Sequence, residues 1–164
     1  MTLGGIGDEI DRAREALDKY LRGLDGFSNG QVAAAKGQPE DQLKRPVGDL
    51  VEALALIIGH AATTAVSESR NAPAAEGAIP DIAVMSIPSL LLGHIELKAP
   101  EKGIRERELV GADKVQYKKF CNLPNLAYTN GRDFRLLRTG EEILYITLAV
   151  DPFAAGAPRV IEWS

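Results

Sequence analysis

Apolar and polar residues alternate along the chain with two periodicities, and each periodicity predicts a type of secondary structure. Three segments carry apolar residues every three or four positions, which is typical of amphipathic helices: Asp8–Leu24, a segment that opens at Gly37 and runs to about Ala65, and Glu108–Cys121. Shorter apolar runs bounded by Pro, Gly or Asn predict strands: a hairpin within Ile79–Pro100, then 125–130, 133–138 and 143–150. The order of these elements predicts an α/β fold, with a mixed sheet flanked by helices.

The hairpin within Ile79–Pro100 is otherwise apolar, yet it contains three charged residues, Asp81, Glu96 and Lys98. A charge in a buried strand needs a partner or a function. A two-residue turn at Pro88-Ser89 gives an antiparallel register in which Asp81 lies opposite Glu96. Lys98 follows Glu96 by two residues and therefore points to the same face of the sheet. Apolar residues on the opposite face can pack on a core: Ile82, Val84, Ile95 and Leu97.

Two carboxylates and an ammonium on one side of a rigid sheet predict a divalent-metal site with a lysine beside it. Mg²⁺ binds through one or two carboxylates and several waters, and it bridges protein and phosphate oxygens. Such ions stabilise the attacking and leaving oxygens of an in-line displacement. A nearby lysine can orient or help deprotonate the attacking water, or neutralise charge on the phosphate. The alternative is a structural ion pair of Lys98 with Asp81 or Glu96 and no chemistry.

Other charged and polar residues permit two interpretations from the sequence alone. Glu40 lies in the first turn of the second predicted helix, where a carboxylate suits the helix dipole, and capping alone explains it. Gln116 lies one turn before Phe120 on the third predicted helix, and a lone glutamine is normally a surface residue. The charged run 101–108 is typical of a solvated loop. Alternatively, its basic residues contact a phosphate backbone; these are Lys102, Arg105 and Arg107.

Composition narrows the class of protein. A chain of 164 residues with 45% hydrophobic and 26% charged residues is expected to be a soluble globular domain, with a helical segment 1–36 before a main domain 37–164. No apolar run is long enough for a membrane span, and the start lacks a signal-peptide pattern. The single cysteine, Cys121, excludes an intrachain disulfide and favours the cytoplasm. The net charge of −4 argues mildly against a dedicated nucleic-acid-binding module, without excluding DNA as a substrate.

Four segments together carry a resemblance to a known family. Pro80-Asp81, followed after fifteen positions by Glu96-Leu97-Lys98, resembles the motif of the PD-(D/E)XK nuclease superfamily. The surroundings, 78–84 and 93–100, resemble the N-terminal nuclease domain of restriction enzymes fused to adenine-specific DNA methyltransferases. The remaining matches are 39–46, the pair Gln116 and Phe120 (with Phe in place of the commoner Tyr), and the strand-turn-strand 125–136.

The resemblance implies a restriction-endonuclease-like αββαβ core and Mg²⁺-dependent DNA cleavage, with Mn²⁺ as a substitute, in a restriction or phage-defence system. Asp81, Glu96 and Glu40 would hold the metal, Lys98 would position the water, and Gln116 would support the site. The chain has no methyltransferase motif, so a methyltransferase or target-recognition domain is expected outside it, in a longer polypeptide or on another chain. A non-catalytic domain for DNA binding or assembly is the competing hypothesis. A homodimer, and RNA or branched DNA as the substrate, stay open.

Overall fold

The computed structural model of the protein describes residues 3–24, 39–67, 79–86, 89–148 and 152–153. These residues form three α-helices and a 3-10 helix: α1 (Leu3–Gly23), η2 (Pro39–Leu43), α3 (Lys44–Ile57) and α4 (Gly111–Phe120). The strands are β1 (Thr63–Ser67), β2 (Ile82–Ser86), β3 (Leu90–Leu97), β4 (Leu126–Thr129), β5 (Asp133–Arg138) and β6 (Glu141–Thr147). The predicted α/β class is confirmed.

The described strands form one six-stranded sheet in the order β1-β2-β3-β4-β5-β6. Every neighbouring pair is antiparallel except β3 and β4, which are parallel. Parallel neighbours need a long crossover, and the segment that contains α4 supplies it. The predicted mixed sheet is therefore confirmed, and the order α3, β2, β3, α4, β4 contains the predicted αββαβ core, with β1 as an additional strand between α3 and β2.

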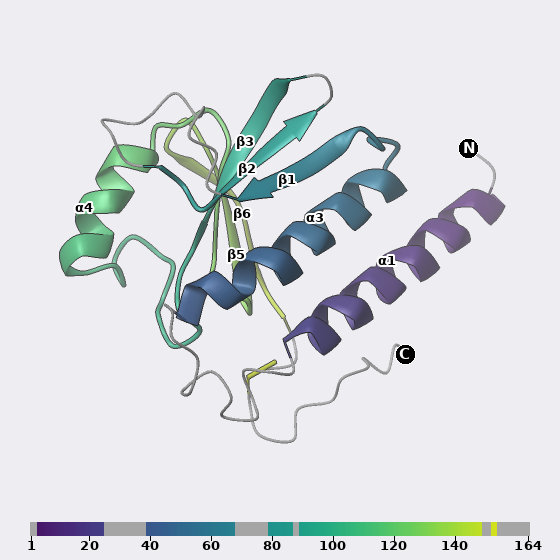
Figure 1. Ribbon diagram of the computed structural model, residues 1–164, viewed down its shortest axis with the longest axis horizontal. Helices are drawn as coiled ribbons and strands as arrows, with labels where there is room; N and C mark the ends of the chain where they lie inside the picture. The colour runs from purple at the N-terminus through teal and green to yellow at the C-terminus, as the bar shows by residue number, and fades with distance from the viewer. Residues whose placement is uncertain (1–2, 25–38, 68–78, 87–88, 149–151, 154–164) are drawn as a thin grey trace.

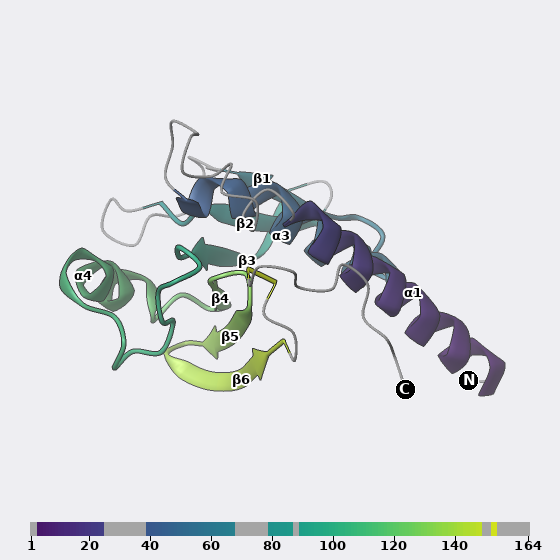
Figure 2. The same ribbon diagram turned by 90° about the horizontal axis from the view of Figure 1, so that it is seen from below.

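The sheet lies between two helical layers, as Figures 1 and 2 show: α1 and α3 lie side by side on one face, and α4 covers the other. Alternation along β3 separates the two cores, since Ile95 and Leu97 join the cluster under α1 and α3. The second cluster joins Tyr117 and Phe120 of α4 to β4 and β5. Glu96 of β3 and Lys98, which follows the strand, point toward the α4 side.

The first predicted helix packs on the rest of the described structure. Tyr20 of α1 is buried, and its hydroxyl donates a hydrogen bond of 2.7 Å to the carbonyl oxygen of Gly131, in the turn between β4 and β5. Gly131 has a φ of +90°, which a residue with a Cβ rarely adopts. The predicted domain boundary at residue 36 falls outside the described residues and stays a prediction.

The second predicted helix is wrong in its length. α3 ends at Ile57, and Gly59 follows with a φ of +88°, the left-handed conformation that commonly terminates helices. The β-branched residues after it form the edge strand β1. Glu52 of α3 accepts hydrogen bonds at 3.0 Å from the Thr64 hydroxyl and at 2.7 Å from the Ala65 backbone N–H. Tertiary contacts therefore override the helical spacing after Gly59.

The third predicted helix, Glu108–Cys121, is shorter in the structure than expected, and one residue of its apolar spacing faces solvent. α4 begins at Gly111, and Val115 is 58% exposed, whereas Tyr117 and Phe120 are buried. The predicted register of the hairpin is confirmed next to the site, because Ile82 pairs with Ile95. The predicted turn residue Pro88 lies outside the described residues. A β-bulge between Val84 and Met85 shifts the register by one residue toward the turn. No described helix is both long and apolar enough to span a membrane.

Candidate active site

Asp81 lies directly before β2, where the pairing of Ile82 with Ile95 extends to place it beside Glu96. Its Oδ2 accepts a hydrogen bond of 2.8 Å from the backbone N–H of Leu97. The Nζ of Lys44, at the start of α3, lies 3.8 Å from Asp81 Oδ1. Burial raises the pKa of Asp81, while the Leu97 N–H and the nearby lysines lower it. The predicted juxtaposition of Asp81 and Glu96 is therefore confirmed.

Glu96 is only 2% exposed. One of its carboxylate oxygens, Oε1, accepts a hydrogen bond of 2.9 Å from Lys98 Nζ, and the other, Oε2, has no hydrogen-bond partner in the described structure. Burial and then the charge of Asp81 raise its pKa to about 7, although Lys98 and the backbone N–H of Asp81 act in the opposite direction. Glu96 is thus a buried carboxyl with one unused oxygen beside a second carboxylate.

Lys98 follows β3 and is 3% exposed. Its Nζ lies 2.9 Å from Glu96 Oε1, 3.0 Å from Asp113 Oδ1 and 2.6 Å from Gln116 Oε1. Burial lowers the pKa of Lys98, but the carboxylates of Glu96 and Asp113 outweigh burial and raise it above its ordinary value. An ammonium, rather than a neutral amine, occupies this position at neutral pH.

Gln116, which the sequence alone assigns to the surface and the family resemblance to the site, contacts Lys98 directly. Phe120, one turn later on α4, is fully buried and anchors that face of the helix. Asp113 was missed by the sequence analysis, although it lies three residues before Gln116 and hence on the same helical face. It pairs with Lys98 and, at 2.8 Å, with Lys102. These bonds outweigh the effect of burial and lower the pKa of Asp113.

Glu40 lies in η2, next to the start of α3. It is close enough for its negative charge to contribute to the raised pKa of Asp81. No three His, Cys, Asp or Glu side chains within the described ranges are grouped closely enough to hold a metal ion. Glu40, the predicted third metal ligand, therefore lies near Asp81 and Glu96 but does not complete a three-residue cluster with them.

The residues present fit a divalent cation bound by two carboxylates. The chemical reason is the donor set: Glu96 Oε2 is buried without a hydrogen bond to any described residue, and the charge of Asp81 raises the pKa of Glu96. A divalent cation at these oxygens would remove the repulsion between the two carboxylates and satisfy the unused oxygen. Mg²⁺ accepts such a pair, with waters at its other positions.

The three predicted DNA contacts do not form one cluster. Lys102 adjoins the site through its ion pair with Asp113. Arg105 stacks on the ring of Tyr145, with the guanidinium carbon 4.0 Å from the ring centroid. Together with Arg107 it lines a shallow groove of about 480 Å³. Of the three, Lys102 is the residue linked to Lys98, through the Asp113 carboxylate that both lysines contact.

Two further polar residues are buried on the same face of the sheet. Tyr128 pairs with Glu96 across β3 and β4, and its hydroxyl has no hydrogen-bond partner among the described residues. His94 is 4% exposed, and both of its ring nitrogens are likewise without a partner there. Burial lowers the pKa of His94, which keeps the ring neutral. His94 makes no hydrogen bond to the charged site residues in the described structure.

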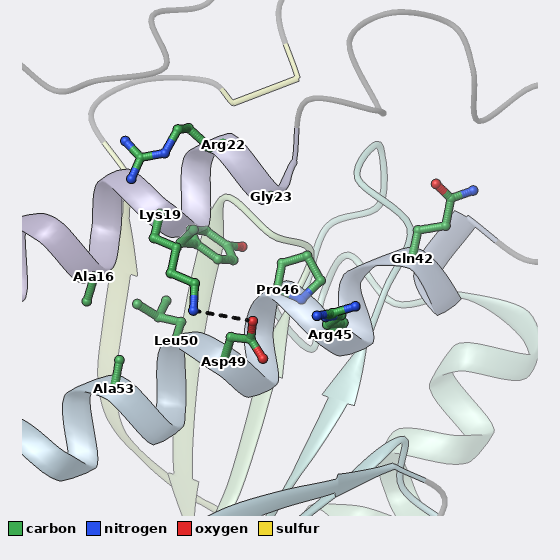
Figure 3. Close-up of a pocket in the computed structure, with 11 residues that line it drawn as sticks. Ala16, Lys19, Arg22, Gly23, Gln42, Arg45, Pro46, Asp49, Leu50 and Ala53 are labelled. Atoms are coloured by element: carbon green, nitrogen blue, oxygen red, sulfur yellow. Dashed lines mark ion pairs between the residues drawn. The ribbon is translucent and has the colours of Figure 1, made fainter.

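A separate pocket of about 470 Å³ lies between α1 and α3 (Figure 3). Lys19 reaches across it from α1 toward Asp49 of α3, with 3.7 Å between the Nζ and Oδ2 atoms. Arg22 points away from this pair in the same view. None of the predicted site residues lines this pocket. The charged cluster around Lys98 is therefore distinct from it.

Comparison with known proteins gives a relative in structure alone. No family model matches the chain, and no curated protein matches its sequence. The cryo-EM structure of a DrdV–DNA complex matches with a TM-score of 0.57, at 19% identity, over 82% of this chain. The chain spans 12% of the length of that chain. At this identity the likeness concerns the fold, which is restriction-endonuclease-like, as predicted.

Proposed function

We propose that the protein is a metal-dependent DNA endonuclease domain of the PD-(D/E)XK nuclease superfamily. One observation carries this proposal. Lys98 Nζ lies 2.9 Å from Glu96 and 2.6 Å from Gln116, beside Asp81. These residues come from separate segments, and all of them belong to the set of site residues that the family resemblance implies. A structural ion pair needs Lys98 and one carboxylate, and leaves the second carboxylate and the glutamine unexplained.

In this proposal Asp81 and Glu96 would hold Mg²⁺, with Glu40 near the same place; Mn²⁺ would substitute. When bound, Mg²⁺ supplies activation of a water and neutralisation of charge at the phosphate. Lys98, held as an ammonium, donates an N–H to the attacking water or to a phosphate oxygen. Gln116 orients the ammonium. Water would then form a bond to phosphorus as the bond to the leaving oxygen breaks; the attacking water gives up a proton to solvent, the leaving oxygen takes one up from solvent, and Lys98 stabilises the charge that develops.

Double-stranded DNA is the proposed substrate. The structural relative is a complex with DNA, and this chain spans 12% of the length of that relative. Lys102, Arg105 and Arg107 would contact the phosphate backbone. Target recognition would then belong to a methyltransferase or target-recognition domain outside this chain, in a restriction or phage-defence system of the cytoplasm.

A second candidate function is DNA binding or assembly without catalysis. It is favoured by one observation, the absence of a three-residue metal-ligand group among the described residues. This alternative expects DNA binding that is indifferent to metal and to substitution of Lys98. The proposed nuclease expects both to matter.

Plasmid cleavage tests the proposal. Supercoiled DNA is incubated with the protein and Mg²⁺ or Mn²⁺, beside Asp81→Ala and Lys98→Ala. Asp11→Ala, which removes an exposed carboxylate of α1, is the matched control. We expect nicking by the wild type and the control, and its loss in both site variants. Equal nicking by all four proteins contradicts the proposal. If the wild type binds DNA without nicking it, and neither metal nor Lys98→Ala changes that binding, the non-catalytic alternative holds.

A further inference from the structure

The Lys98 ammonium is hydrogen-bonded to its full capacity. A lysine ammonium has three N–H donors and no acceptor. Three acceptors lie within 3.0 Å of Nζ: Glu96 Oε1, Asp113 Oδ1 and Gln116 Oε1. The side chain is 4% exposed. A water or a phosphate oxygen can therefore bond to Lys98 only when one of these three contacts is released.

Asp113 divides its carboxylate between two lysines. Oδ1 lies 3.0 Å from Lys98 Nζ, and Oδ2 lies 2.8 Å from Lys102 Nζ. The side chain of Lys102 is 44% exposed, and that of Asp113 is 21% exposed. Lys102 can thus meet a polyanion in solvent, whereas Lys98 is enclosed. Asp113 connects the exposed cation to the buried one.

The three acceptors of Lys98 respond differently to a divalent cation. A cation at Asp81 and Glu96 would draw Glu96 away from Lys98 and would repel the ammonium. Gln116 is neutral and offers no charge against that repulsion. Asp113 is the remaining carboxylate in contact with Lys98 among the described residues, and it pulls from the α4 side.

We infer, on the basis of the proposed function, that Asp113 is a positioning residue that links phosphate binding at Lys102 to the placement of Lys98. A DNA phosphate that bonds to Lys102 competes with Asp113 Oδ2 for the same ammonium. The Asp113 carboxylate then interacts with Lys98 alone, while Glu96 gives up its hydrogen bond to Lys98. The N–H that pointed to Glu96 becomes available to the water or the phosphate oxygen. Asp113 itself contacts neither substrate nor metal.

The first test follows the side-chain ammonium of Lys98 by NMR in lysine-labelled protein and needs no cleavage. A buried ammonium with three acceptors exchanges its hydrogens slowly, and Lys98→Arg identifies the signal by its loss. We expect Asp113→Ala to accelerate exchange about tenfold, as for loss of one charge-assisted hydrogen bond, with Asp113→Asn in between. Lys118→Ala, an exposed lysine of α4, is the control and leaves the rate unchanged. An unchanged rate in both Asp113 variants, shown by thermal unfolding to be folded, overturns the inference.

The second test addresses the link to Lys102 with a short DNA duplex and Ca²⁺ as a non-cleaving cation. We expect the duplex to shift the Lys102 Cε signal and to accelerate exchange at Lys98 in the wild type, because the N–H that Glu96 releases becomes accessible to water, and to leave Lys98 unaffected in Lys102→Met. Duplex binding without any change at Lys98 overturns the link while the nuclease proposal stands. Failure of the wild type to bind either DNA or metal overturns both, and the exchange data on Asp113→Ala then show separately whether the resting contact exists.

Discussion

The side-chain oxygen of Gln116 lies 2.6 Å from Lys98 Nζ, although the two residues are 18 positions apart in the chain. A neutral acceptor at this place holds the ammonium against α4 without cancelling its charge. Glu96 and Asp113 supply the negative charge from two other directions. The orientation of Lys98 therefore depends on contacts from β3 and from α4 together.

Gln116→Ala is expected to impair cleavage more than folding. A hydrogen bond to a charged group contributes about 1.5–3 kcal/mol, so its loss lowers the nicking rate by about tenfold to a hundredfold. The measurement is the initial rate of plasmid nicking, with DNA affinity measured in parallel. Val115→Ala, at the exposed neighbouring position, is the control and keeps the wild-type rate. A Gln116→Ala rate equal to that of Val115→Ala contradicts the assigned role.

Lys98→Met is expected to destabilise the fold in the absence of metal. It leaves Glu96 buried beside Asp81 without the ammonium, and removal of one partner from a buried charge pair costs about 3–5 kcal/mol. Urea unfolding measures the loss. The double variant Lys98→Met/Glu96→Gln removes the unpaired carboxylate and should recover part of the stability. A single variant within about 1 kcal/mol of the wild type would show that Lys98 and Glu96 interact only weakly.

Stability and metal binding should depend on pH in opposite directions because of Glu96. Its pKa in the folded protein, about 7, lies above the ordinary value of 4.5, so the folded state keeps a proton that the unfolded chain has released. The free energy of unfolding of the metal-free protein should therefore fall by up to about 3 kcal/mol as the pH rises from 4.5 to 7. Mg²⁺ needs the ionised carboxylate, so its affinity should rise over the same interval.

Glu96→Gln is the control for this pH dependence. Urea unfolding between pH 4.5 and 8 should show a smaller fall for the variant than for the wild type, and calorimetry should show weak Mg²⁺ binding at every pH. Parallel pH profiles of the two proteins would assign the effect to another group.

The hydroxyl of Tyr128 should contribute little to stability. It is buried without a hydrogen-bond partner among the described residues, and burial and then the charge of Glu96 raise its pKa. Tyr128→Phe should therefore change the free energy of unfolding by less than about 1 kcal/mol. Tyr20→Phe is the matched comparison, since that hydroxyl donates to Gly131 at 2.7 Å, and it should lose about 1–2 kcal/mol. A loss at Tyr128 as large as at Tyr20 would indicate a bridging water.

Strand periodicity sufficed to predict much of the site. Alternation along β3 placed Glu96 and Lys98 on one face, and the hairpin register placed Asp81 beside Glu96, because side-chain direction in a strand follows directly from position. The bulge at Val84 and Met85 was not predictable from this alternation, yet it lies beyond the site and leaves the pairing there intact.

Contacts between helices and strands were harder to predict from the sequence. The approach of α4 to β3 depends on the packing of Phe120 and Tyr117, and without that packing Gln116 resembles a surface residue and Asp113 resembles an ordinary first-turn acid. Strand β1 was missed for a related reason: a helical spacing continued across Gly59, and only pairing with β2 stabilises the extended conformation.

The most direct measurement of the central claim is a crystal structure of the protein with Mn²⁺, with the anomalous signal used to locate the ion. We predict a peak between the carboxylates of Asp81 and Glu96, about 2.1 Å from an oxygen of each, with Lys98 still in contact with Gln116. The same crystals of Asp81→Ala should lack the peak. No anomalous peak between Asp81 and Glu96 at saturating Mn²⁺, or a peak only at a distant site, would contradict the proposal that these two residues form a metal-dependent nuclease centre.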